Sequence, residues 1–196
     1  MNKWCSLLYS LIFMSVCATT QAQVYLGAGY GITEPTNMGD GNTFPETEGD
    51  AGYRVYVGNA LYENFAVEFS YVDLGTYEVG TIDGQPDPLV FEDTISITGG
   101  DIAIVGKWNW TRYLNVYSRA GVFVWEGERY VHETVDVNGV MVEQEATLSF
   151  DGYDVSVGIG LDYQILRRVG VQLEANAYMT DEVANYLYGL SVYYTF

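Results

Sequence analysis

Hydrophobic and polar residues alternate one by one in eight separate blocks of this chain. A period of two residues is typical of a β-strand with one apolar face, because successive side chains point to opposite sides of a sheet. After the first 22 residues, no stretch reaches the roughly 18 apolar residues that a transmembrane helix needs. We therefore predict eight strands, at residues 24–32, 53–60, 65–74, 102–110, 114–126, 153–163, 169–179 and 186–196.

The connections between these blocks alternate strictly between short and long. The short ones read "LYEN", "WTRY" and "QILRR", and the long ones span residues 33–52, 75–93, 127–152 and 180–185. Short turns at one end and long loops at the other are typical of an up-and-down barrel with an even number of strands. The predicted fold class is all-β, an eight-stranded antiparallel up-and-down barrel.

Alternation alone does not say which face of the barrel points inward. The polar phase mixes glycines with charges of both signs, which suits a narrow lumen better than a solvent-exposed face. Aromatic residues of the apolar phase gather at the strand ends, as in the two interfacial girdles of a membrane barrel. They are Trp108, Trp110, Tyr163 and Phe196 at the short-turn end, and Tyr30, Tyr71 and Tyr153 at the long-loop end. The apolar face is therefore predicted to face lipid, with short periplasmic turns and long extracellular loops.

The first 22 residues have the pattern of a secretory signal. Lys3 precedes an apolar run from Leu7 to Val16, and Thr20-Gln21-Ala22 forms a small-residue cleavage site. We expect a cleaved signal peptide at residues 1–22 and one barrel domain at residues 23–196. The net charge of −18 argues against a nucleic-acid partner, which requires a basic surface.

The last strand, "YLYGLSVYYTF", alternates to its end and stops on Phe196. This ending, together with "VYLGAGYGI" and "YVGNALYENFAVEFSYVDLG", resembles the OmpA-like eight-stranded outer-membrane β-barrel family, without the peptidoglycan-binding domain of some members. The resemblance implies the outer membrane of a Gram-negative cell, contact with its lipid and lipopolysaccharide, and recognition of the last strand by the barrel-assembly machinery. On this reading Tyr194 and Phe196 carry the assembly signal, and Trp108 and Trp110 belong to the girdle.

Charged residues of the polar phase fall inside the predicted lumen. Buried charges persist only when they are paired and hydrogen-bonded, so we expect an interlocked network. Glu68 and Lys107 lie about three residues from the short-turn end on adjacent strands and are expected to pair. The predicted network comprises Arg54, Glu68, Asp101, Lys107, Arg119, Asp154 and Glu174.

Alternation continues within the third long loop on both sides of a two-residue turn signal, Asn138-Gly139. An Asn-Gly turn would pair the flanking residues directly and extend strands five and six well beyond the membrane. The exposed edges of such a ribbon invite strand addition by an extracellular protein partner. The predicted partner-binding hairpin is marked by Val135, Val137, Asn138, Gly139, Val140 and Val142.

No motif in the chain indicates an enzyme, a cofactor or a metal site. His132 is the only histidine and is interpreted as a solvated loop residue. The acidic loop "MGDGNTFPETEGD" lacks the Asp-x-Asp-x-Asp-Gly spacing of a calcium loop. No cofactor and no catalytic residue are therefore predicted.

Three functions remain open on the sequence. The first is a monomeric integral barrel with a structural or surface-interaction role, such as adhesion or envelope contact, carried by its extracellular loops. The second is a small passive pore for water, ions or small solutes. The third is a soluble periplasmic ligand-binding barrel.

Overall fold

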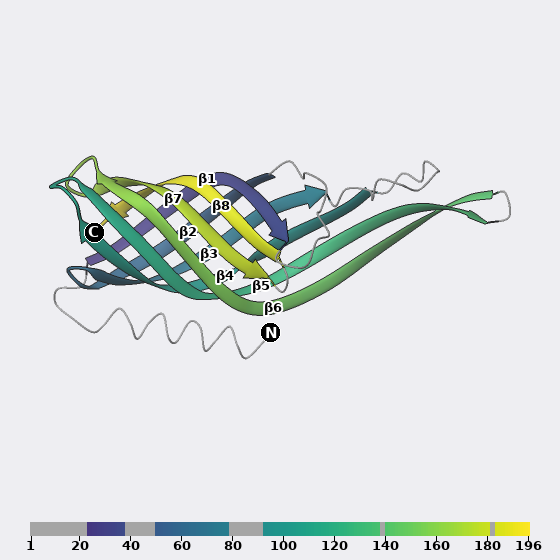
Figure 1. The fold of residues 1–196 in the computed structure, drawn as a ribbon, viewed down its shortest axis with the longest axis horizontal. Helices are drawn as coiled ribbons and strands as arrows, with labels where there is room; N and C mark the ends of the chain where they lie inside the picture. Colours follow the sequence, from purple (N-terminus) through teal and green to yellow (C-terminus); the bar gives the residue numbers. More distant parts are fainter. Residues whose placement is uncertain (1–22, 38–49, 79–91, 138–139, 181–182) are drawn as a thin grey trace.

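The computed structural model describes residues 23–37, 50–78, 92–137, 140–180 and 183–196, so the expected signal peptide lies outside the described residues. Eight strands form one closed antiparallel barrel, in which each strand pairs with the next and β8 pairs with β1 (Figure 1). The predicted fold is thereby confirmed. Within the described ranges, no helix is long and apolar enough to cross a membrane. The strands are β1 Gln23–Asn37, β2 Asp50–Tyr62, β3 Phe65–Glu78, β4 Glu92–Asn109, β5 Leu114–Val137, β6 Val140–Gln164, β7 Val169–Thr180 and β8 Val183–Thr195.

The apolar phase of the strands faces outward. In β2, Val55 and Val57 are exposed, whereas Arg54, Tyr56 and Gly58 between and beside them are buried in the lumen. Large exposed apolar side chains occur in the same way on every strand of the barrel. The interpretation as a soluble periplasmic barrel is therefore wrong, because such a barrel would turn this face inward.

Exposed aromatic side chains form a band near each end of this apolar wall. Trp108, Trp110 and Phe196 lie at the short-turn end, and Tyr30 and Tyr153 lie toward the long-loop end. Aromatic rings at these two heights match the two interfaces of a lipid bilayer.

The last strand closes the barrel against the first. The β1–β8 register begins at Tyr25–Thr195, and the Phe196 amide donates a hydrogen bond to the Val24 carbonyl oxygen at 3.0 Å. The rings of Tyr194 and Phe196 meet edge to face, with centroids 5.2 Å apart. The closing strand is thus hydrogen-bonded up to the final residue, which leaves no free backbone edge facing lipid.

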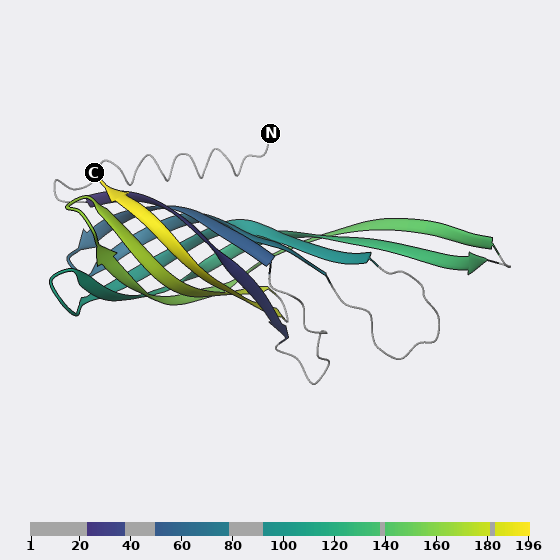
Figure 2. The ribbon, with the colours of Figure 1, turned by 90° about the horizontal axis from the view of Figure 1, so that it is seen from above.

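Strands β5 and β6 continue far past the rest of the barrel as a hairpin (Figures 1 and 2). Their pairing continues without a break to Val135–Val142 and Val137–Val140, which the alternation predicts. The turn residues Asn138 and Gly139 lie outside the described residues. Strand β4 begins at Glu92, ten residues before the predicted strand, because residues 92–101 pair with β5.

Most bulky rings of the lumen lie opposite glycines on the neighbouring strand. Tyr25 is in register with Gly58, and Tyr56 with Gly27. A Cβ atom added to either glycine would overlap the facing ring. The same relationship holds for Tyr117–Gly160, Trp125–Gly152, Phe150–Gly127 and Tyr193–Gly170. The lumenal glycines therefore provide the space that the rings occupy.

Candidate functional site

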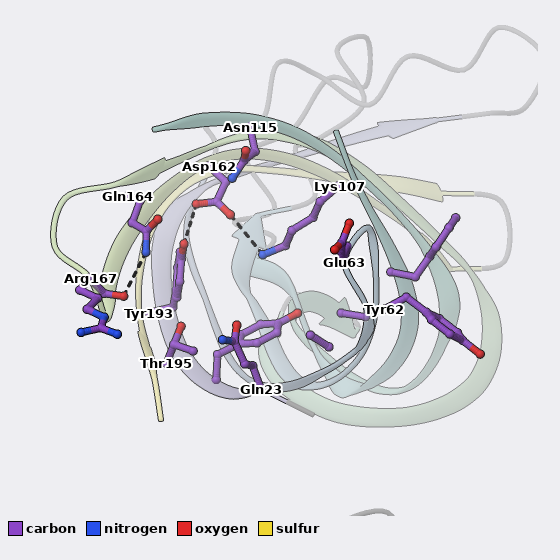
Figure 3. A pocket seen from close by; sticks show the side chains of 14 residues that line it. Gln23, Tyr62, Glu63, Lys107, Asn115, Asp162, Gln164, Arg167, Tyr193 and Thr195 are labelled. Atoms are coloured by element: carbon purple, nitrogen blue, oxygen red, sulfur yellow. Dashed lines mark hydrogen bonds and ion pairs between the residues drawn. The ribbon is translucent and has the colours of Figure 1, made fainter. Parts of the chain in front are cut away.

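At the short-turn end, the lumen opens into a polar cavity of about 350 Å³ (Figure 3). Lys107 on β4 reaches across this mouth to Asp162 on β6, with Nζ 3.1 Å from Oδ2. Tyr193 on β8 donates to the other oxygen of Asp162 at 2.7 Å. The Lys107 side chain remains 22% exposed, so this ion pair borders the cavity and is open to water on one side.

The centre of the lumen holds an arginine between two carboxylates. Arg54 is 1% exposed, and its Nη1 and Nη2 donate to Glu68 at 3.1 Å and to Glu174 at 2.6 Å. Tyr25 donates to Glu68 at 2.7 Å, and Tyr117 donates to Glu174 at 3.2 Å. Each carboxylate thus accepts from a tyrosine as well as from the guanidinium, which offsets the cost of burying it.

A second arginine lies on the long-loop side of this group. Arg119 on β5 pairs with Asp101 on β4, and both side chains are buried. Arg119 also donates to Tyr178 at 2.9 Å and to Asn176 at 3.3 Å. Asp101 accepts further hydrogen bonds from Ser70 and Ser156. Five strands contribute to this cluster, from β3 to β7, so it ties the barrel together across the lumen.

The predicted network thus divides into separate groups. Arg54, Glu68 and Glu174 form one group, and Asp101 and Arg119 form another. The expected pair between Glu68 and Lys107 is wrong, because Glu68 binds Arg54 and Lys107 binds Asp162. Because the strands are tilted, residues at equal distances from their strand ends lie at different heights around the barrel, so Glu68 and Lys107 are not side by side.

Asp154 lies apart from these arginines, near the long-loop mouth. Its carboxylate accepts a hydrogen bond from Trp125 Nε1 at 2.9 Å. The lumenal acid that sequence reasoning missed is Asp162, although it shares the polar phase of β6 with Asp154. Four lumenal tyrosines that the sequence analysis does not name, Tyr25, Tyr56, Tyr117 and Tyr193, also occupy the polar phase of their strands.

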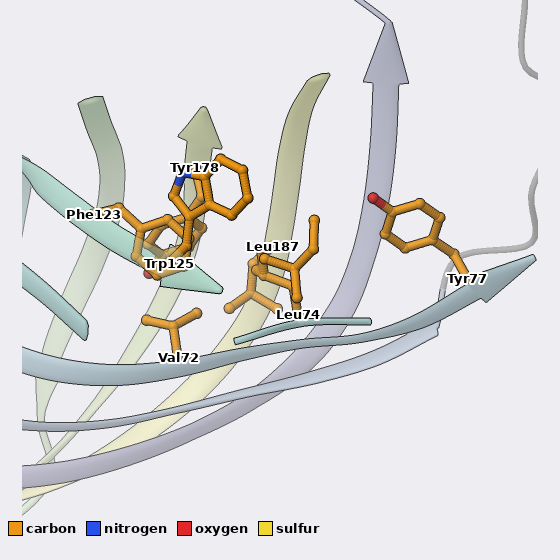
Figure 4. Close-up of a cluster of buried hydrophobic side chains, with 8 residues drawn as sticks. Val72, Leu74, Tyr77, Phe123, Trp125, Tyr178 and Leu187 are labelled. Atoms are coloured by element: carbon orange, nitrogen blue, oxygen red, sulfur yellow. The ribbon is translucent and has the colours of Figure 1, made fainter. Parts of the chain in front are cut away.

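On the long-loop side of the arginines, apolar side chains fill much of the lumen. A cluster of eight buried side chains crosses it, and Figure 4 shows seven of them labelled. The cluster consists of Val72, Leu74, Tyr77, Ile97, Phe123, Trp125, Tyr178 and Leu187. Both phases of β5 are apolar at this height, in "VFVW" at residues 122–125, and this local loss of alternation is the signal in the sequence.

The protruding hairpin leaves strand edges without a neighbour. The β6–β7 register ends at Ser156–Tyr178, and the β4–β5 register ends at Glu92–His132. Among the described residues, β6 therefore has no strand partner on its β7 side from Val140 to Ser149. His132 lies on β5 in register with Glu145. The described part of the chain contains no group of three His, Cys, Asp or Glu residues that could hold a metal ion.

A closed eight-stranded barrel with a lipid-facing apolar wall, two aromatic bands and a polar lumen defines the class of outer-membrane β-barrel proteins. The chain belongs to the outer membrane protein beta-barrel domain family, whose match covers residues 6–196. It is therefore a protein of the cell outer membrane, and its short-turn end is periplasmic and its long-loop end extracellular. No curated protein sequence matches this chain.

Solved outer-membrane barrels share the fold at low sequence identity. Ail, the attachment invasion locus protein of Yersinia pestis, is 14% identical with a TM-score of 0.57, over 90% of this chain and 100% of Ail. Neisserial surface protein A is 12% identical with a TM-score of 0.53, over 88% and 97% of the two chains. OprG from Pseudomonas aeruginosa is 13% identical with a TM-score of 0.52, over 89% and 95%. At these identities the likeness extends to the fold alone.

Proposed function

We propose that this protein is a non-enzymatic surface-interaction protein whose contact element is the β5–β6 hairpin. The observation that carries the proposal is the β6 edge from Val140 to Ser149, which has no neighbouring strand on its β7 side among the described residues and lies on a ribbon that extends beyond the rest of the barrel. Such an edge offers unpaired backbone N–H and C=O groups to an extended segment of a partner.

The charge of the extracellular side defines the partner further. Residues 33–50, 73–93, 126–154 and 180–185 hold 21 of the 26 acidic residues of the chain and one basic residue, Arg129. Ail has been crystallised with sucrose octasulfate, a heparin analogue, which is a polyanion. A polyanion would be repelled by the acidic surface of the present chain, so the proposed partner is a protein with a basic surface.

The lumen favours this role over passive conduction. Its charges are engaged with one another, and the apolar cluster lies above them. An eight-stranded barrel is narrow enough for side chains to fill. We therefore propose a closed, monomeric barrel. Its last strand would be recognised by the assembly machinery, and its wall would contact membrane lipid and lipopolysaccharide.

A hairpin-shortened variant tests the proposal. Replacing residues 132–145 by Asn-Gly joins the paired residues Val131 and Ala146 through a two-residue turn. The matched control deletes residues 80–91, which removes the same net number of residues and links the paired residues Glu78 and Thr94 by three residues. Both variants should keep the heat-modifiable gel mobility of a folded barrel.

Adhesion of cells that display each version is then measured on surfaces coated with a basic protein or with heparin. The intact chain and the control variant should adhere to the basic surface, the hairpin-shortened variant should lose adhesion, and none should adhere to heparin. Equal adhesion of the two variants would refute the hairpin as the contact element. In a separate experiment, conductance of the intact protein in planar bilayers would favour the alternative of a small passive pore.

A further inference from the structure

The extracellular mouth of the lumen contains a cavity of about 700 Å³, to which the function proposed above assigns no role. We call it the mouth cup. It is lined by Tyr77, Ile95, Ile97, Trp125, Phe150 and Asp154, which come from four consecutive strands, β3 to β6, and by residues of β7 and β8 opposite them. A cavity of this size lies within the range of sites for small molecules.

The walls of the mouth cup are mainly apolar and include three aromatic rings, of Tyr77, Trp125 and Phe150. The rings of Trp125 and Phe150 have centroids 5.7 Å apart and planes inclined at 71°, so they form a corner. Because Tyr77, Ile97 and Trp125 line the cup and also belong to the buried apolar cluster that crosses the lumen, this cluster is the floor of the cup. A concave apolar surface at a mouth that opens to water gains free energy when an apolar group covers it.

One carboxylate lies in this aromatic wall. Asp154 accepts a hydrogen bond from Trp125 Nε1 at 2.9 Å, which holds its side chain beside the indole. A carboxylate attracts a cation directly, and the faces of aromatic rings attract it through their quadrupoles. The acidic extracellular segments raise the local concentration of cations in the same direction.

We propose that the mouth cup binds small organic ammonium cations that carry an apolar group. The apolar group would pack against the Trp125–Phe150 corner, and the ammonium would lie between the Asp154 carboxylate and the rings. Because the apolar cluster forms the floor, the ligand is held at the surface and is not passed to the periplasm. The cup residues Phe150 and Asp154 follow the hairpin edge along β6, and the ligand differs from the partner proposed above.

Tryptophan fluorescence reports on the cup directly. In a Trp108→Phe/Trp110→Phe variant, Trp125 is the only tryptophan after residue 22. The purified protein is titrated in a maltoside detergent, because amine-oxide and phosphocholine headgroups would themselves compete. The probes are benzyltrimethylammonium, neutral benzyl alcohol and anionic benzenesulfonate, which share a ring and differ in charge.

We expect saturable quenching by benzyltrimethylammonium at a concentration at least about tenfold below that for benzyl alcohol, and none by benzenesulfonate. Asp154→Asn keeps the shape and the acceptor for Trp125, and it should weaken the cation about tenfold while leaving benzyl alcohol unchanged. Asp151→Asn is the matched control, because Asp151 is an exposed acid on the opposite face of β6 and loses the same charge.

Each other outcome overturns the proposal. Equal affinities for the three probes would mean a merely apolar cup. Equal weakening by Asp151→Asn and Asp154→Asn would mean that the acidic surface attracts cations without a site. Quenching that does not saturate would mean that the probe does not bind.

Discussion

Arg54 on β2 and Glu174 on β7 are joined across the lumen by a 2.6 Å hydrogen-bonded ion pair between strands that are not neighbours in the barrel. The two residues are 120 positions apart in the chain. Such a bond forms only when the barrel is closed, so it stabilises closure rather than any single hairpin.

Removing this arginine should therefore weaken the whole barrel. Arg54→Met leaves Glu68 and Glu174 buried without their cation, and we expect a loss on the order of 3–5 kcal/mol in the free energy of unfolding. Urea titration of the protein in lipid vesicles measures the loss. Arg112→Met, in an exposed turn, should change stability by less than about 0.5 kcal/mol. A comparable change at both arginines would contradict the buried pairing.

The pairing of Lys107 can be tested with two double-mutant cycles. Lys107→Met should couple to Asp162→Asn by roughly 0.5–3 kcal/mol, because the two side chains are in contact. Coupling of Lys107→Met to Glu68→Gln should be smaller, because the two side chains are not in direct contact and each interacts with Tyr25 instead. Stronger coupling to Glu68 than to Asp162 would restore the pair expected from sequence.

Because lumenal rings lie opposite glycines on neighbouring strands, adding a methyl group to such a glycine should destabilise the barrel. Gly58→Ala should destabilise the barrel by roughly 1–3 kcal/mol, because the new methyl group would overlap the Tyr25 ring. It should also displace the Tyr25 hydroxyl from Glu68. Gly100→Ala is the control, because nothing lies within 4 Å of its added Cβ, and it should be neutral or slightly stabilising. Equal stabilities of the two variants would contradict this packing.

The outward apolar face predicts a depth-dependent penalty for charge. Val157 is exposed on β6 between the aromatic residues Tyr153 and Tyr163, so Val157→Arg should cost roughly 2–4 kcal/mol in vesicles. Thr147→Arg lies on the same strand and phase but in the protruding hairpin, and it should cost little. A spin label at position 157 should report lipid, and contact with water there would argue against the orientation.

Deletion of Phe196 should slow assembly while leaving synthesis and secretion intact. The deletion removes a 69%-exposed ring and the last hydrogen bond between β8 and β1. The fraction of heat-modifiable protein in the outer membrane over time measures assembly. Trp110→Ala removes an equally exposed ring at the same end but outside the closing strand, and it should assemble faster than the deletion. Equal rates would mean that the final residue has no special role.

The alternation of residues determined the number, order and orientation of the strands. Lipid requires an apolar side chain at every second position, so the sequence of each strand indicates by itself which face points outward. Strand boundaries at the hairpin followed from the same alternation, since Val135 and Val137 repeat it beyond the membrane.

The sequence did not determine the partners inside the lumen, and only the tertiary structure did. Which acid faces Lys107 depends on strand tilt and on the stagger around the closed barrel, and neither is encoded in the pattern of a single strand. The mouth cup could not be predicted from the sequence for a related reason. Phe123 and Trp125 point inward where Val122 and Val124 point outward, so the sequence shows an unbroken apolar run, and only closure of the barrel separates its lipid face from its lumen.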